Sequence, residues 1–291
     1  RYIRSILLEL ERIHSHLLWI GVACHLLGYD TGFMHTWRIR EYIMKLCEEL
    51  TGNRKTYGLN LIGGVRRDIK EENKGKIIKI LNYVEDEFKK FIDCLLALRE
   101  VKARLEGTGI LPKSKAWKLG VVGPTLRASA IKSDVRYDDP YAIYDELDWN
   151  VIVYDTCDVA ARIFVRIDEV IESVRMCKQI VEKLPEGDYR IKLPRRVPEG
   201  EVVSKVEAPR GELLHYIKSD GSDKPFRFKA RTPTLANIPA VCEMLKGGYI
   251  ADIPITLASI DPCFSCTDRL AFVDINTGRK LVCSLERFKH L

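Results

Sequence analysis

Two cysteines near the C-terminal end have the types and the spacing that could do chemistry. Cys263 and Cys266 lie in the stretch Ile260–Arg269. A Cys-x-x-Cys pair places two soft sulfur ligands within one turn of chain, which suits a shared metal ion or a redox disulfide. No second such pair completes a zinc site, and Pro262 precedes the pair without the βαβ context of a thioredoxin-like motif. Spacing alone therefore favours metal ligation only slightly over a redox pair or two core cysteines.

Three further polar groups could act together with this pair. Arg210 follows Pro209 at a strand-like stretch and precedes a glycine, an arrangement that can bring a guanidinium close to a ligand. The segment Arg231–Thr234 leads into a helix, where free N–H groups and a hydroxyl can bind a small anion. Asp261 stands just before the cysteines and could orient Arg210 or a metal-bound species. Taken singly, these groups are better explained as a surface ion pair, a helix cap and a turn residue.

Composition excludes several classes of protein. The chain of 291 residues is 46% apolar and 30% charged, which is typical of a globular protein. Its net charge of +6 is spread along the chain without a basic patch interleaved with aromatics, so we expect no nucleic-acid partner. Most of the nine cysteines are scattered singly, as in a reduced cytoplasmic protein. The most apolar run, residues 17–27, is shorter than the ~20 residues that span a bilayer.

The elements that must position these groups follow from the apolar periodicity. Amphipathic spacing predicts long helices at residues 2–27, 35–50, 71–105 and 155–184. Between them, Gly63-Gly64 predicts a turn or a close backbone approach, and residues 107–141 predict irregular structure of the kind that often carries function. His14 and His16 are two residues apart on the first helix and cannot share an ion, so a polar core contact or a hydrogen bond across an interface is expected for each.

The second half of the chain changes character. Alternating residues predict strands at 201–218 and 225–229 around a turn at 219–222, then a helix at 235–245, an apolar segment at 250–260 and a hairpin at 270–282. This pattern predicts an α+β fold, in which a bundle of long helices carries a small β hairpin insertion. We expect one domain over residues 1–291, with the bundle at 1–185, the β insertion at 186–234, and the metal-ligand segment with its tail at 235–291.

These motifs together resemble a known family. Asp261-Pro262-Cys263 and Cys266, followed by Thr267-Asp268-Arg269 and preceded by Ala208–Gly211 and Pro233-Thr234, are similar to the catalytic large subunit of nickel-iron hydrogenases, in particular the energy-converting, membrane-bound group. The resemblance covers nearly the whole chain. Other stretches resemble both this group and its sister, the large peripheral-arm subunit of respiratory complex I; they are Glu9–Leu18, Ile62–Val65, Gly123–Ser129, Asp139–Tyr141, Tyr144–Glu146 and Ser219–Ser222. The cysteines favour the hydrogenases, because the complex I relatives lack thiolates at this position.

The resemblance implies a nickel-iron centre whose iron carries CO and cyanide ligands. Cys263 would be a terminal ligand of nickel, and Cys266 would bridge nickel and iron. Pro209, Pro233 and Thr234 would line the cofactor pocket, with Thr234 donating a hydrogen bond to a cyanide.

The resemblance also implies the catalytic residues. Arg210 would lie over the open metal site, held by Asp261, where it helps to polarise or deprotonate hydrogen. Because a guanidinium is a poor base, we expect an electrostatic role for it.

Three departures from the family pattern bear on this interpretation. The family supplies two more thiolates from an N-terminal Cys-x-x-Cys, which this sequence lacks. We therefore expect an N-terminal part to be missing, and the fragment alone to be inactive. Ala161 stands where relatives often carry an acid before Arg162, and residues 270–291 follow Arg269, after which many relatives are trimmed.

The implied function is reversible H2 oxidation and proton reduction, coupled to a low-potential carrier such as ferredoxin. Electrons would leave through iron-sulfur clusters in partner subunits, because the chain has no cluster-binding cysteine set of its own. The implied partners are an iron-sulfur small subunit, a ferredoxin-like subunit and membrane-embedded antiporter-like subunits, which would hold the protein peripherally at the cytoplasmic face of the cell membrane. Two alternatives stay open: a complex I-like electron-transfer or quinone oxidoreductase subunit without nickel, and a helical scaffold with a structural zinc.

Overall fold

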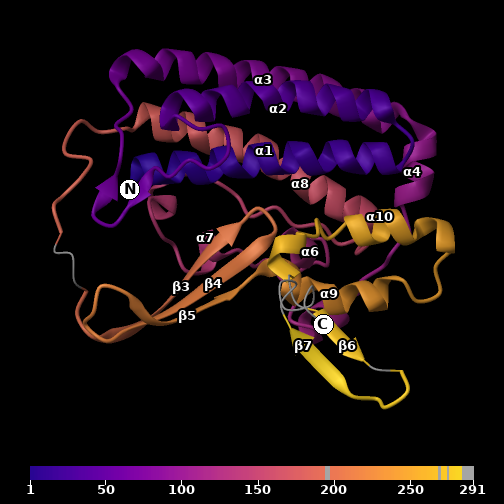
Figure 1. Cartoon of the computed structure of the whole chain (residues 1–291). Helices are drawn as coiled ribbons and strands as arrows, with labels where there is room; N and C mark the ends of the chain where they lie inside the picture. Colours follow the sequence, from indigo (N-terminus) through magenta and orange to yellow (C-terminus); the bar gives the residue numbers. More distant parts are fainter. Residues whose placement is uncertain (194–196, 268–269, 274, 284–291) are drawn as a thin grey trace.

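Long helices form the body of the protein, whose structure is a computed structural model (Figure 1). They are α1 (Tyr2–Leu26), α2 (Asp30–Thr51), α3 (Glu71–Ala97) and α8 (Val159–Glu182). Helix α1 contacts α2 and α8, and α3 also contacts both of these, so the four helices enclose one apolar core. The structure describes residues 1–193, 197–267, 270–273 and 275–283.

Helix α1 lies at the centre of this bundle. Most of its apolar side chains are buried, among them Ile6, Leu10 and Leu17. Polar side chains are buried on it as well, notably Glu9 and Arg12, each 0% exposed. A helix in contact with neighbours on several sides has no solvent-facing stripe of ordinary width, and the buried charges must therefore find partners inside the protein.

The predicted long helices are confirmed, with corrected ends. The second helix begins at Asp30 and not at residue 35. The expected single helix at 71–105 is wrong at Leu98, whose backbone is extended (φ −82°, ψ 106°), and a separate helix α4 (Arg99–Leu105) follows. The fourth helix begins at Val159 and not at 155, because the Asp158 carboxylate caps it by accepting a hydrogen bond from the Ala161 N–H at 2.8 Å.

The connecting segments are more ordered than expected. The region 107–141 holds the short helices α5 (Lys113–Lys118), α6 (Pro124–Arg127) and α7 (Val135–Asp138), and η1 (Tyr144–Glu146) follows it. Strands β1 (Asn60–Leu61) and β2 (Gly64–Val65) flank the Gly63-Gly64 turn. The predicted close approach there is confirmed, because a Cβ on Gly64 would lie 2.2 Å from the carbonyl oxygen of Tyr189.

A three-stranded antiparallel sheet projects from the bundle (Figure 1). It consists of β3 (Gly200–Ala208), β4 (Gly211–Ser219) and β5 (Pro225–Arg231), in that order. The single strand expected at 201–218 is therefore wrong. The chain reverses at Pro209 and Arg210, and Gly211 supplies the positive φ (+127°) that the reversal requires. The predicted turn at 219–222 is confirmed between β4 and β5.

The last part of the chain returns to the bundle. Helix α9 (Pro233–Met244) begins two residues earlier than predicted, and η2 (Ile250–Asp252), α10 (Ile253–Ala258) and η3 (Phe264–Thr267) follow. Strands β6 (Leu270–Val273) and β7 (Lys280–Cys283) form the expected hairpin. The fold is thus a mixed α+β fold, as predicted. Among the described helices, none has the length and apolar character needed to cross a membrane.

Candidate functional site

The predicted site residues converge from three separate segments. The β3–β4 turn carries Pro209 and Arg210, the start of α9 carries Pro233 and Thr234, and the segment from Asp261 through η3 carries both cysteines. Helix α9 contacts both η3 and β4. In Figure 1 these elements meet at the end of the sheet nearest the bundle. The structure therefore brings together residues that lie more than fifty positions apart.

Arg210 and Asp261 form an ion pair beside the cysteines. The Arg210 Nη2 atom lies 3.0 Å from Asp261 Oδ1, and its Nε–H donates to the Asp261 carbonyl oxygen at 2.9 Å. Burial raises the pKa of Asp261, although Arg210 and Arg166 favour its charged form. The other carboxylate oxygen, Oδ2, is buried without a hydrogen-bond partner. Two bonds thus fix the Arg210 guanidinium, as the sequence predicted, and the carboxylate keeps one free acceptor.

Two glycines set the position of the Arg210 turn. Gly123 precedes α6 and adopts φ +70°, and a Cβ there would lie 2.3 Å from Gly211 Cα and 2.6 Å from the Arg210 carbonyl oxygen. A Cβ on Gly211 would likewise lie 2.9 Å from the backbone of Gly123. Real Cβ atoms do not come this close to backbone, so only glycine fits at either position. This contact fixes the turn against the α6 segment, far away in sequence.

Backbone hydrogen bonds hold the two cysteines. The Cys263 N–H donates to the Thr234 hydroxyl oxygen at 3.2 Å, and the Cys266 N–H donates to the Cys263 carbonyl at 3.1 Å. The Thr232 hydroxyl donates to the Cys266 carbonyl at 2.9 Å. Because the Thr234 oxygen accepts from Cys263, its own hydrogen is still available for another acceptor. Both thiols are partly exposed, so a ligand can reach them.

The two thiols differ in acidity. Burial raises the pKa of Cys263, but hydrogen bonds from Cys266 and the nearby Arg210 guanidinium outweigh burial and lower it. Burial and the Cys263 thiolate together raise the pKa of Cys266. The first proton is therefore lost from Cys263. Two adjacent sulfur ligands, one of them with a lowered thiol pKa, fit a soft metal ion such as nickel.

The described residues supply only part of a metal ligand set. Nowhere in residues 1–193, 197–267, 270–273 and 275–283 do three or more His, Cys, Asp or Glu side chains gather around one point that could hold a metal. Cys263 and Cys266 alone would leave a metal ion short of ligands. Asp268 and Arg269, which belong to the resembling motif, lie outside the described residues.

Helices α1 and α8 hold the residues that directly precede the cysteine segment. The Trp19 Nε1–H donates to the Ala258 carbonyl at 2.7 Å, and the Arg162 Nε–H donates to the Ser259 hydroxyl at 2.8 Å. Burial lowers the pKa of Arg162 to about 9. Arg166 stacks over the Trp19 ring, 4.2 Å from its centroid, and its Nε and Nη2 atoms are buried without hydrogen-bond partners.

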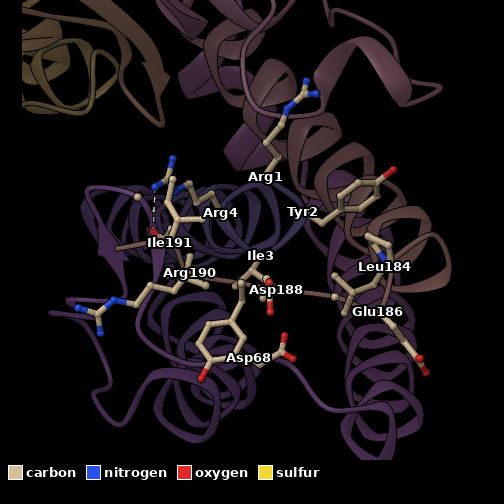
Figure 2. Close-up of a pocket in the computed structure, with 16 residues that line it drawn as sticks. Arg1, Tyr2, Ile3, Arg4, Asp68, Leu184, Glu186, Asp188, Arg190 and Ile191 are labelled. Carbon is tan, nitrogen blue, oxygen red and sulfur yellow. Dashed lines mark hydrogen bonds between the residues drawn. The ribbon is translucent and has the colours of Figure 1, made fainter. Parts of the chain in front are cut away.

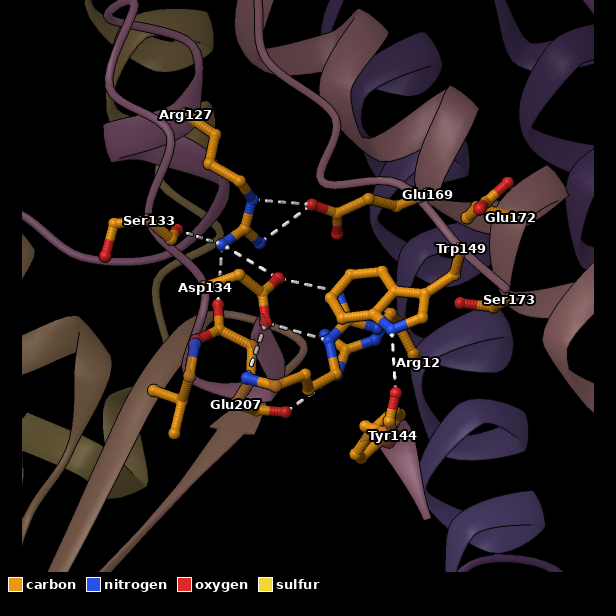
Figure 3. Close-up of polar contacts among 12 residues, drawn as sticks. Arg12, Arg127, Ser133, Asp134, Tyr144, Trp149, Glu169, Glu172, Ser173 and Glu207 are labelled. Carbon is orange, nitrogen blue, oxygen red and sulfur yellow. Dashed lines mark hydrogen bonds and ion pairs between the residues drawn. The ribbon is translucent and has the colours of Figure 1, made fainter. Parts of the chain in front are cut away.

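Sequence analysis missed a buried cluster of charged side chains next to this site. In Figure 3, Arg127 lies between Glu169, Asp134 and Glu207, which come from different elements. His16 belongs to the same cluster, 2.8 Å from Glu169, which confirms the predicted polar core contact. The available signal was the spacing of Glu9, Arg12 and His16, which places charges on the inward side of α1.

A cavity of about 360 Å³ lies elsewhere in the molecule (Figure 2). It is lined by the start of α1, the β2 region and residues 184–191. Arg1, Arg4, Asp68 and Asp188 give it a mixed charge. None of the predicted site residues lines it.

Comparison with known proteins gives the family. Residues 27–196 and 191–269 match the family described as the respiratory-chain NADH dehydrogenase, 49 Kd subunit. Formate hydrogenlyase subunit 5 of Escherichia coli (strain K12) is 39% identical over 98% of this chain, which spans 51% of that protein. The membrane-bound hydrogenase subunit alpha of Pyrococcus furiosus is 39% identical over 97% of this chain, which spans 69% of it.

Two further relatives carry different names. An NADH-quinone oxidoreductase subunit of Rhizobium etli is 37% identical, with 92% of this chain and 74% of that one covered. A chain in the structure of the membrane-bound sulfane sulfur reductase, an archaeal respiratory membrane complex, superimposes with a TM-score of 0.86 at 35% identity over 90% of this chain and 73% of that one. The chain thus spans about half of one relative and about three quarters of others. It belongs to the 49 kDa subunit family of respiratory-chain NADH dehydrogenase, which includes membrane-bound hydrogenase subunits.

Proposed function

We propose that this chain is part of the catalytic large subunit of a membrane-associated nickel-iron hydrogenase. The observation that carries the proposal is the placement of Cys263 and Cys266 beside the Arg210–Asp261 ion pair. Relatives named as hydrogenase subunits, at 39% identity, support it. The role of an oxidoreductase subunit of a membrane complex is common to the hydrogenase and NADH-quinone oxidoreductase relatives.

Each residue of the site has a task in this proposal. Cys263 and Cys266 would hold the metal, and two further thiolates would come from a segment outside this sequence. A nickel-iron centre, when bound, supplies a Lewis acid at which H2 is split heterolytically beside a base. Pro209, Pro233 and Thr234 would shape the pocket for its CO and cyanide ligands, with the free Thr234 hydroxyl hydrogen as donor.

Arg210 would act by its charge. Its guanidinium is fixed by Asp261 on one side and lies close enough to Cys263 to favour the thiolate. A fixed positive charge stabilises anionic sulfur and any negative charge that develops at the site, without reorganisation during the reaction. Asp261 is then a positioning residue, because it holds the guanidinium through two bonds.

The proposed partners are those that the sequence resemblance implies. An iron-sulfur small subunit and a ferredoxin-like subunit would carry electrons away, and membrane-embedded antiporter-like subunits would hold the protein peripherally at the cytoplasmic face of the membrane. A low-potential carrier such as ferredoxin would exchange electrons with H2.

The thiol ligands can be tested by substitution in the full-length protein. We expect Cys263→Ser and Cys266→Ser each to abolish nickel retention, measured by elemental analysis after purification. Cys242→Ser is the matched control, since Cys242 is exposed on the nearby helix α9. Nickel retention that is unchanged in both site variants would refute the assignment.

A second candidate is a relative that transfers electrons without nickel. Two observations favour it: the described residues bring together only two thiols, and the fold superimposes on a chain of the sulfane sulfur reductase complex. This candidate predicts that the full-length protein contains no nickel and no infrared bands of CO or cyanide, and that its complex reduces quinone or a sulfane sulfur compound.

A further inference from the structure

A buried ion cluster joins helices α1, α6, α7 and α8 to strand β3 (Figure 3). We use this name for eight side chains that ion-pair distances of at most 3.3 Å link into one connected set: Glu9, Arg12, His16, Arg127, Asp134, Arg136, Glu169 and Glu207. Each side chain is at most 3% exposed. Charges this deeply buried are tolerated only where they compensate one another.

The cluster holds one more acid than it holds guanidinium groups. Four carboxyl groups face three guanidiniums, and His16 does not supply the missing charge because burial lowers its pKa to about 4. The next cation along α8, Arg166, donates to the Arg162 carbonyl and stacks on Trp19, and its charge acts on both Asp261 and Glu169. If all four acids were ionised, the eight side chains of the cluster would carry one net negative charge among themselves. A single proton on one carboxyl removes that charge.

Three of the carboxyl groups are well supplied with donors in their ionised form. Asp134 accepts from Arg136 Nε at 2.9 Å and from Nη2 at 2.7 Å. Glu9 accepts from the Tyr144 and Ser173 hydroxyls and from two arginines, and Glu169 accepts from Arg127 and His16. Hydrogen bonds to the charged form favour ionisation.

Glu207 is the carboxyl group that is left with the fewest donors. It accepts from Arg127 Nη1 at 2.8 Å and from the Val135 N–H at 3.1 Å. It shares the Nη1 atom with Asp134, whose Oδ2 lies 3.2 Å away from it. Two carboxyl groups on one nitrogen do not both ionise readily. Burial and Asp134 accordingly raise the pKa of Glu207 to about 7, while Arg127, Arg12 and Arg136 oppose that rise.

Glu207 is also joined to the turn that carries Arg210. Arg12 donates to the Glu207 carbonyl at 2.7 Å and to the Ala208 carbonyl at 3.3 Å. The Glu207 N–H donates to the Tyr141 hydroxyl oxygen at 3.0 Å. These hydrogen bonds therefore hold Glu207 and Ala208, the last two residues of β3, against the cluster. Pro209 and Arg210 follow them directly in the chain.

We propose that Glu207 holds the one exchangeable proton of the buried ion cluster and stores it behind the β3–β4 turn. In a subunit that takes up or releases protons together with electrons, such a carboxyl is a proton reservoir close to the reacting site. The reservoir role rests on the proposed function. The proton site itself rests only on the cluster's charges and geometry, and needs no bound metal.

Infrared difference spectroscopy of the purified full-length protein tests the proton site. We expect acid-minus-alkaline spectra to show the C=O stretch of a protonated carboxyl group that shifts in D2O and disappears with a midpoint near neutral pH. The band should be absent in Glu207→Gln, which imitates the protonated side chain. It should persist in Glu201→Gln, because Glu201 lies exposed on the same strand.

A second variant separates the loss of the proton site from misfolding of the protein. Glu207→Asp keeps a carboxyl group, and we expect its band to return with a shifted midpoint. Identical spectra for the wild type and Glu207→Gln, or a band that titrates at the ordinary glutamate value of about 4.3, would overturn the proposal. Nickel content, measured on the same samples, reports on the proposed function separately, since the proton band does not depend on it.

Discussion

The contact between Gly123 and Gly211 gives the sharpest prediction about how the site is positioned. In Gly123→Ala, the new Cβ would lie 2.3 Å from Gly211 Cα and 2.6 Å from the Arg210 carbonyl. Both are backbone atoms, so no side chain can rotate away and the β3–β4 turn must move. The turn carries Arg210, and its displacement weakens the ion pair with Asp261.

The expected loss in the free energy of unfolding of Gly123→Ala has two parts. Gly123 has φ +70° and ψ −151°, a conformation that costs a non-glycine residue about 1–3 kcal/mol, and overpacking costs about 1–3 kcal/mol more. We therefore expect Gly123→Ala to lower the free energy of unfolding by roughly 2–6 kcal/mol. Gly120 is the control for positive φ: it has φ +65° and no atom within 4 Å of an added Cβ, so Gly120→Ala adds no overpacking.

Denaturant unfolding followed by circular dichroism measures both variants. The expected result is a clear excess cost for Gly123→Ala over Gly120→Ala, together with reduced nickel retention in the full-length protein. Equal free energies of unfolding for the two variants would show that the close approach does not constrain the turn.

Three further predictions concern the interior. The pKa of Glu207 is raised from 4.5 to about 7, so between these pH values the folded state keeps a proton that the unfolded state loses. As the pH rises from 4.5 to 7, the free energy of unfolding of the wild type should therefore fall by about 3 kcal/mol relative to that of Glu207→Gln. Parallel pH profiles of the two proteins in denaturant unfolding would contradict this. Arg127→Met strands two or more buried carboxylates and should cost about 3–5 kcal/mol, against under about 1 kcal/mol for Arg175→Met at an exposed pair; equal thermal unfolding would be the contrary result. Trp19→Phe should cost about 1 kcal/mol through its lost bond to the Ala258 carbonyl, whereas the exposed Trp117→Phe should cost nothing measurable.

The long helices were predictable because their signal is local. Apolar residues recur at helical spacing along each one, and a buried face requires that spacing whatever lies opposite. The break at Leu98 was not predictable in this way, because the residues on both sides of it are good helix formers. Alternation alone could not divide residues 201–218 into two strands either, because the turn between the two strands packs against Gly123, which lies in another segment of the chain.

The site was predictable in its parts but not in its surroundings. The Arg210–Asp261 pair followed from residue types and resemblance, and the structure brings the two together. The buried ion cluster had no comparable signal, because periodicity treats a charged residue as solvent-facing. Arg127 and Glu207 are eighty positions apart, and only the folded chain shows that Arg127 donates a hydrogen bond to the Glu207 carboxyl group.

The metal content of the full-length protein tests the central claim most directly. The claim is that Cys263 and Cys266 hold half of a nickel-iron centre. It predicts nickel bound in stoichiometric amount, infrared bands from CO and cyanide, and the loss of both in Cys263→Ser. Full-length protein that is folded and complexed with its partners, yet carries neither nickel nor those bands, would contradict it.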